Sequence, residues 1–201
     1  MISINAKLLR IASMFSSKGS IRYYLNGVYV EKADEGVILV ATDGHRLIVI
    51  NDKTGNCGED GKIIRLSKNI ILETKKSKLE KEERLVEISE DGELTIRRQP
   101  EGEKIVTYPN GFIDGTFPEW RSAFQWNIEK PSPSAFNAKY LNDFGRVSKE
   151  LNGSEFISIK GTENGPSIVR FYNCDYAFGV IMPVRFGSMG VPESMKYLET
   201  K

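Results

Sequence analysis

The chain has 201 residues, of which 40% are hydrophobic and 27% charged, enough for one large domain or for one domain with a smaller partner. The N-terminus carries Lys7 and Arg10 inside its apolar region, unlike a signal peptide, and no apolar run reaches the roughly 20 residues that cross a bilayer. Cys57 and Cys174 lie far apart and form neither a disulfide framework nor a zinc motif. We therefore expect a cytoplasmic protein with reduced thiols, no cofactor, no metal and no membrane partner.

The charge is balanced overall but unevenly distributed. There are 28 basic and 27 acidic residues, so the net charge of +1 does not by itself indicate a nucleic-acid-binding protein. Residues 1–30 contain no Asp or Glu, whereas acidic residues gather later in the chain. Segregated charge of this kind can still present one basic surface.

A layout with a period of about sixty residues organises the chain. Each repeat starts with a short apolar strand, at residues 2–4, 63–66 and 134–136, followed by a capping residue and an amphipathic helix. Asn5, Ser67 and Asn137 are the predicted caps, because each side chain can accept a hydrogen bond from an unpaired backbone N–H. Three short strands follow each helix, at 23–31, 36–42 and 46–51, at 84–89, 94–98 and 103–108, and at 156–160, 167–172 and 176–182. The sequence therefore predicts three βαβββ units in the α+β class.

Basic residues lie away from the predicted apolar stripe of each helix. The stripes are Leu8, Ile11, Ala12 and Phe15 in the first helix and Leu141, Phe144, Val147 and Leu151 in the third. The cations are Lys7, Arg10 and Lys18, then Lys68 and Lys75, and then Lys139, Arg146 and Lys149. A solvated face is the ordinary explanation for any single helix. Its repetition in three units favours one shared basic surface that contacts phosphates without reading sequence.

Four short segments carry a family resemblance. They are Arg22-Tyr23-Tyr24-Leu25-Asn26-Gly27, Ala41-Thr42-Asp43-Gly44-His45-Arg46-Leu47, Phe117-Pro118-Glu119-Trp120-Arg121 and Val180-Ile181-Met182-Pro183-Val184-Arg185. The first three closely resemble the middle domain of the bacterial replicative sliding clamp, the beta subunit of DNA polymerase III. The fourth resembles the end of that family's chain. The resemblance covers residues 1–186.

This resemblance implies the DNA-clamp fold, in which helices line the channel of a ring and antiparallel sheets form its outside. Such proteins are not enzymes. They encircle double-stranded DNA and recruit a DNA polymerase and other replication or repair proteins, and the family also implies an ATP-dependent clamp loader as a partner. A shortened clamp of this kind would suit a phage or another mobile element.

The resemblance also implies a peptide-binding cleft with two walls. One wall would be Arg22, Tyr24, Leu25, Thr42, Gly44, His45, Arg46 and Leu47, and the other Val180, Met182, Pro183, Val184 and Arg185. An apolar floor with a few polar groups suits a short peptide with Leu or Phe anchors. His45 is the only histidine, and by itself it would be read as a structural residue, since no ligand cluster accompanies it.

The chain departs from the family in its number of units. Residues 1–124 resemble a complete middle domain, residues 125–186 resemble only the second half of the last domain, and residues 187–201 form a tail beyond the family's end. A residue that is commonly Pro is Gln125 here, which alters the expected pocket. The family's ring contains twelve units, so three units per chain predict a homotetramer.

Two other classes of function compete with a clamp. A clamp-like adaptor or decoy would capture clamp-binding peptides without encircling DNA. An enzyme is poorly supported, because the sequence offers no phosphate-binding glycine loop, no nucleophile with a nearby base and no distinctive pair of carboxylates.

Overall fold

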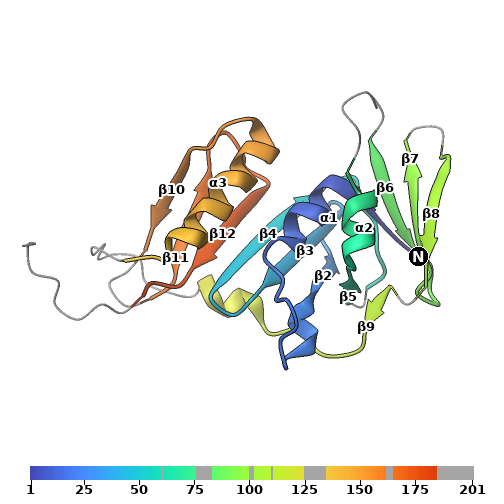
Figure 1. Cartoon of the computed structure of the whole chain (residues 1–201), viewed down its shortest axis with the longest axis horizontal. Helices are drawn as coiled ribbons and strands as arrows, with labels where there is room; N and C mark the ends of the chain where they lie inside the picture. Colours follow the sequence, from blue (N-terminus) through green and yellow to red (C-terminus); the bar gives the residue numbers. More distant parts are fainter. Residues whose placement is uncertain are drawn as a thin grey trace, which may run out of the picture.

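The structure is a computed structural model that describes residues 1–59, 61–75, 83–99, 102–109, 111–124, 135–161 and 165–184. Three successive units follow one another along the chain (Figure 1). The first comprises β1 (Ile2–Asn5), α1 (Ala6–Ser13), the 3₁₀ helix η1 (Tyr23–Asn26), β2 (Gly27–Lys32), β3 (Val37–Thr42) and β4 (Arg46–Asp52). The second comprises β5 (Lys62–Arg65), α2 (Lys68–Glu73), β6 (Arg84–Ile88), β7 (Leu94–Arg98) and β8 (Lys104–Tyr108), followed by β9 (Phe112–Ile113) and the 3₁₀ helix η2 (Trp120–Phe124). The third comprises α3 (Ala138–Asn152), β10 (Ile157–Lys160), β11 (Ser167–Phe171) and β12 (Ala177–Ile181).

These elements confirm the predicted α+β class, with two differences in detail. Residues 23–26 form a 3₁₀ helix rather than the start of a strand, because Asn26 exchanges hydrogen bonds with the backbone of Ser20 and Leu25 is buried. The strand expected at 134–136 is reduced, within the described residues, to one bridge between Ala135 and Val184. Residues 125–134 and 185–201 lie outside the described residues, so the domain boundaries at 124 and 186 stay predictions.

The three predicted helix caps are confirmed. The Asn5 side chain accepts hydrogen bonds from the backbone N–H groups of Lys7 and Leu8. Ser67 Oγ accepts from Ile70 N at 3.2 Å, and Asn137 Oδ1 accepts from Lys139 N at 3.0 Å. Each cap satisfies one or two of the donors that the first turn of a helix leaves unpaired.

Two antiparallel sheets arise because the first two units exchange their first strands. The four-stranded sheet has the order β1-β6-β7-β8, so β1 of the first unit joins the strands of the second. The eight-stranded sheet has the order β10-β11-β12-β4-β3-β2-β5-β9, so β5 of the second unit joins the strands of the first. The third unit continues this larger sheet through the pairing of β12 with β4.

The helices α1 and α3 pack on one face of the eight-stranded sheet, where they share a core with its inward-facing residues (Figure 1). On α1 the buried leucine is Leu9, and Leu8 of the predicted stripe is only half-buried. The rings of Phe15 and Phe144, which join the first and third units, have centroids 4.8 Å apart. A Cβ atom at Gly179 would lie 2.1 Å from Cε1 of Phe144, so the missing side chain is what lets α3 approach β12. Within the described residues, no helix has the length and apolarity to span a membrane.

Candidate functional site

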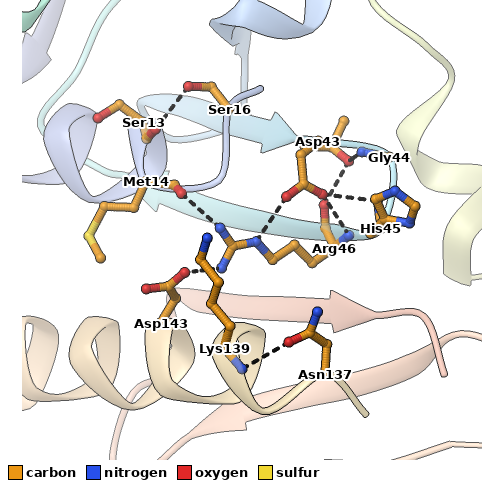
Figure 2. Close-up of polar contacts among 11 residues, drawn as sticks. Ser13, Met14, Ser16, Asp43, Gly44, His45, Arg46, Asn137, Lys139 and Asp143 are labelled. Carbon is orange, nitrogen blue, oxygen red and sulfur yellow. Dashed lines mark hydrogen bonds and ion pairs between the residues drawn. The ribbon is translucent and has the colours of Figure 1, made fainter. Parts of the chain in front are cut away.

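Arg46 joins the first and third units on the helix side of the sheet (Figure 2). Its guanidinium donates to Asp43 Oδ2 at 3.1 Å, to Asp143 Oδ2 of α3 at 2.6 Å and to the carbonyl oxygen of Met14 at 3.2 Å. The same group lies 4.6 Å from the ring centroid of Phe15 and 4.7 Å from that of Tyr140. The side chain is only 8% exposed, so its charge is satisfied inside the protein.

Side chains of a strand alternate between the two faces of a sheet, which separates Arg46 from Leu47. Arg46 points toward the helices, whereas Leu47 belongs to a cluster on the opposite face, which we call the outer face. This outer cluster comprises Leu25, Val40, Leu47, Val49, Ile63, Ile113, Phe117 and Val180. The predicted peptide-binding cleft uses the outer face. The Arg46 side chain lies on the other side of the sheet, so we correct its assignment to the cleft.

The junction of β4 and β12 places residues of the two predicted walls next to each other on the outer face. Leu47 pairs with Val180 across the two strands, and both side chains are buried in the outer cluster. Leu25 and half-buried Tyr24 pack against the same cluster. Beyond the end of β12, Met182 and Val184 are exposed by 40% and 45%. A buried apolar floor with exposed apolar side chains at its edge can bind the apolar anchors of a peptide.

The turn between β3 and β4 is held by its own side chains. Asp43 Oδ1 accepts hydrogen bonds from the backbone N–H groups of His45 and Arg46, and Thr42 Oγ1 accepts from Gly44 N. Gly44 has φ +90°, and the Arg22 guanidinium lies so close that a Cβ there would be 2.8 Å from Arg22 Nη2. The turn thus brings Arg22 close to residues 42–45.

His45 is exposed, and its contacts are with other residues of the fold. Its carbonyl oxygen accepts a hydrogen bond from Met182 N at 2.9 Å, which ties the turn to the residue after β12. Its ring stacks near Tyr140 of α3, with centroids 6.2 Å apart. Among the described residues, no group of three or more His, Cys, Asp or Glu side chains could hold a metal ion.

Aromatic stacking extends the outer cluster away from the junction. The rings of Tyr29 and Phe117 stack with centroids 4.9 Å apart. Burial raises the pKa of the Tyr29 hydroxyl, and the nearby Glu31 carboxylate raises it further. The Tyr29 side chain is therefore neutral at physiological pH, which suits its place against apolar residues.

On the helix side, a hollow of about 510 Å³ collects residues from all three units. Lys7 and Arg10 come from α1, Lys75 follows α2, and Glu150 comes from α3. Arg10 donates to both carboxylate oxygens of Glu150, at 3.1 and 2.5 Å, and its side chain is 14% exposed. The hollow is lined by Lys7, Arg10, Thr74, Lys75, Glu83, Arg84 and Glu150, so basic groups outnumber acidic ones.

The amino-acid sequence of this chain matches a known protein family. The family model of the central domain of the DNA polymerase III beta subunit matches residues 6–119, which is more than half of the chain. The chain belongs to this family. The beta sliding clamp of Escherichia coli K12 is 30% identical over 131 residues, covering 62% of this chain and 32% of that protein. The beta sliding clamp of Pseudomonas aeruginosa PAO1 is 31% identical over 120 residues, covering 57% of this chain and 30% of that protein. The chain thus aligns with about a third of the length of these curated relatives.

Solved sliding clamps share the fold over a longer stretch. The clamp of Bacillus subtilis has a TM-score of 0.67 at 19% identity, and the superposition covers 92% of this chain and 64% of the clamp chain. A clamp of P. aeruginosa has a TM-score of 0.64 at 21% identity, and the superposition covers 92% of this chain and 65% of the clamp chain. The similarity in fold therefore includes the third unit, which lies beyond the match to the family model.

The cations predicted to face DNA differ in their surroundings. Lys18, Lys68, Lys75 and Lys139 are exposed, and Lys7 is half-buried. Three others meet acidic partners: Arg10 meets Glu150, Arg146 lies 3.6 Å from Asp143, and Lys149 lies 2.6 Å from Glu155. The counter-charge on Arg10 depends on how α1 and α3 pack. Asp143 lies three residues before Arg146 and Glu155 six residues after Lys149, so these two pairs are local in the sequence.

Among the predicted cleft residues, Pro183 is half-buried and Arg185 lies outside the described residues. Phe178 packs against the outer cluster and was not predicted. The period of two along β12 could have identified it, because Phe178 stands two residues before Val180.

Proposed function

We propose that this chain is a subunit of a sliding clamp that encircles double-stranded DNA and holds a polymerase or another replication or repair protein on it. The observation that carries the proposal is the match of residues 6–119 to the central domain of the DNA polymerase III beta subunit. In this role the protein has no catalytic residues. Its tasks are topological linkage to DNA and the binding of partner proteins, with an ATP-dependent loader as a further partner.

The helix side supports the DNA-binding half of the proposal. Lys7, Lys68 and Lys75 belong to the first two units, and Lys139 stands on the first turn of α3. Exposed lysines attract phosphates through charge and counterion release, which requires no contact with bases. Arg10 contributes less than its position suggested, because Glu150 neutralises it.

The outer face supports the partner-binding half. Leu47 and Val180 would form the floor for an apolar anchor, and Met182 is a flexible, exposed side chain suited to several partners. The proposed cleft keeps Arg22, Tyr24, Leu25, Thr42, Gly44, His45, Pro183, Val184 and Arg185 from the sequence analysis and omits Arg46. We expect a short peptide of the Gln-x-x-Leu-Phe type to bind there weakly, since ordering the peptide costs free energy.

Retention on closed circular DNA tests the proposal. The clamp is loaded on nicked circular plasmid, and bound protein is separated from free protein by gel filtration before and after a single cut. Topological linkage predicts that the bound fraction is lost on linearisation, because the protein slides off the ends. Equal retention on circular and linear DNA would contradict a clamp and would indicate ordinary surface binding.

The competing function is a clamp-like adaptor or decoy that binds clamp-interacting peptides without encircling DNA. The observation that favours it is the neutralisation of Arg10, Arg146 and Lys149 by acidic neighbours. An adaptor of this kind binds the peptide but shows no difference between circular and linear DNA.

A further inference from the structure

The units of this chain meet through two kinds of junction. In the first kind, two units exchange their first strands: β1 of the first unit pairs with β6, and β5 of the second unit pairs with β2. In the second kind, the last strands of two units pair antiparallel, as β4 and β12 do. In each junction the two units contribute equivalent strands, so an approximate twofold axis relates the two units.

Each unit's first strand also contacts the segment that follows its own last strand. Ser3 bridges Asn56 after β4, β5 pairs with β9 after β8, and Ala135 bridges Val184 after β12. The third unit is therefore built like the other two. It differs in one respect: among the described residues, the segment at Ala135 has no second neighbour of the kind that β6 and β2 provide.

The strand β10 is the counterpart of β2 and β6, and it forms an edge of the eight-stranded sheet. Both counterparts are covered by the first strand of another unit, whereas β10 has one neighbour, β11, among the described strands. Apolar side chains around it are exposed: Phe156 by 73%, Tyr172 by 56% and Ile159 by 38%. An open edge flanked by exposed aromatic residues is suited to pairing with another chain.

The strand β8 is open in a corresponding way. It is the last strand of the second unit and forms the edge of the four-stranded sheet, whereas the last strands β4 and β12 pair with each other. Figure 1 shows β8 and β10 at opposite ends of the molecule. Between Lys104 at its start and Tyr108 at its end, β8 carries the uncharged residues Ile105, Val106 and Thr107. Pairing two copies of β8 antiparallel therefore places no like charges opposite each other in the centre.

We propose that two copies of this chain meet through their third units, and that a different pair of copies meets through β8. In the first interface, residues 135–137 of each copy pair with β10 of the other, which repeats the strand exchange of the first two units. In the second interface, the two β8 strands pair antiparallel, which repeats the junction of β4 and β12. Both interfaces are isologous, and the two use opposite ends of the chain.

This inference rests on the proposed ring and gives it a symmetry. In a ring of twelve units, the twofold axes at the two ends of a three-unit segment are a quarter turn apart. Perpendicular twofold axes generate D2 symmetry, so alternating the two interfaces closes the ring with four copies. A head-to-tail contact between β8 and β10 would instead use one interface and produce cyclic symmetry.

Two variants separate these arrangements. Tyr172 N donates to Phe156 O, so Phe156 and Ser158 form hydrogen-bonded pairs with β11 and the N–H of Ile159 points away from it. Ile159→Pro removes an outward donor without removing a hydrogen bond to β11, and Ile159→Lys is the second variant in case proline disturbs the strand. Thr107→Lys adds a charge to β8, where Ile105, Val106 and Tyr108 pack against the core, whereas Thr107 pairs with Thr95, whose hydroxyl oxygen lies 3.1 Å from its own.

Sedimentation velocity at micromolar concentration, with circular dichroism as the check on folding, measures the outcome. We expect the parent to sediment as four chains of 22.6 kDa, each single variant as a dimer and the double variant as a monomer. A monomeric parent, or a tetramer that persists in the folded single variants, would overturn the proposal. Monomers from either single variant would overturn it too, because they would indicate one head-to-tail interface.

The same samples separate this inference from the proposed function. Suppose that the parent is a tetramer and the variants have the expected sizes, but the parent is not retained on circular DNA. This result supports the interfaces and contradicts the clamp. A parent that is retained on circular DNA while the folded single variants remain tetramers supports the clamp and contradicts these interfaces.

Discussion

Arg46 at the start of β4 donates a hydrogen bond to Asp143 on α3 at 2.6 Å, and this pair crosses the junction between the first and third units. Both side chains are largely buried, with exposures of 8% and 15%. Because the Arg46 guanidinium also contacts Asp43 and the rings of Phe15 and Tyr140, it fixes α3 against α1 independently of the strand pairing. The junction that supports the proposed cleft therefore has a polar anchor on its opposite face.

We expect Arg46→Met to destabilise the protein by about 3–5 kcal/mol, because it removes the guanidinium that two largely buried carboxylates share. The free energy of unfolding in urea measures the effect. Arg170→Met is the matched control, since Arg170 is an exposed arginine of the third unit and should change stability little. Adding Asp143→Leu to Arg46→Met should recover part of the loss; a loss equal to the sum of the two single effects would show that the pair is not coupled.

We expect Gly179→Ala to destabilise the third unit by about 1–3 kcal/mol, because the new methyl group must displace the Phe144 ring. Thermal unfolding measures the change. Gly58→Ala is the control, since its Cβ would meet no atom within 4 Å. Equal stability of the two variants would mean that α3 can move away from β12 at little cost.

We expect Lys139→Glu to reduce retention on circular DNA, because it reverses an exposed charge on the proposed channel side. If Lys139 neutralises one phosphate, the slope of log affinity against log salt should become shallower by about 1 in this variant. Arg170→Glu is the matched control: Arg170 pairs with Phe178 across β11 and β12, which places it on the outer face. A similar loss of retention in both variants would point to net charge rather than to a DNA-facing surface.

We expect Met182→Glu to abolish binding of a Gln-x-x-Leu-Phe peptide while retention on circular DNA stays at the parent level. Met182 is 40% exposed, so the change introduces a charge beside the proposed pocket without burying it in the core. Fluorescence anisotropy of the labelled peptide measures binding. Lys53→Glu, on an exposed residue after β4, serves as the control. Unchanged affinity in Met182→Glu would remove the outer face as the peptide site.

The repeating unit and its local signals can be read from the sequence alone. The caps at Asn5, Ser67 and Asn137 depend on a side chain and an N–H two or three residues away, so local patterns were sufficient to find them. The turn at Asp43 and Gly44 is local in the same way, because Asp43 accepts from N–H groups two and three residues ahead of it. The motifs around residues 22–47 and 180–185 were likewise enough to identify the family, since they are read along the chain.

The pairing of the units, and the face that each motif residue uses, depend on the tertiary structure. The exchange of β1 and β5 and the pairing of β4 with β12 join residues far apart in sequence, which no local pattern specifies. Arg46 and Leu47 are neighbours within one motif, yet the pleat sends the first to the helices and the second to the outer face. Asp43 beside Arg46 is local in the sequence, whereas Glu150 beside Arg10 and Asp143 beside Arg46 come from α3, about 100 residues or more away, and only packing brings them near.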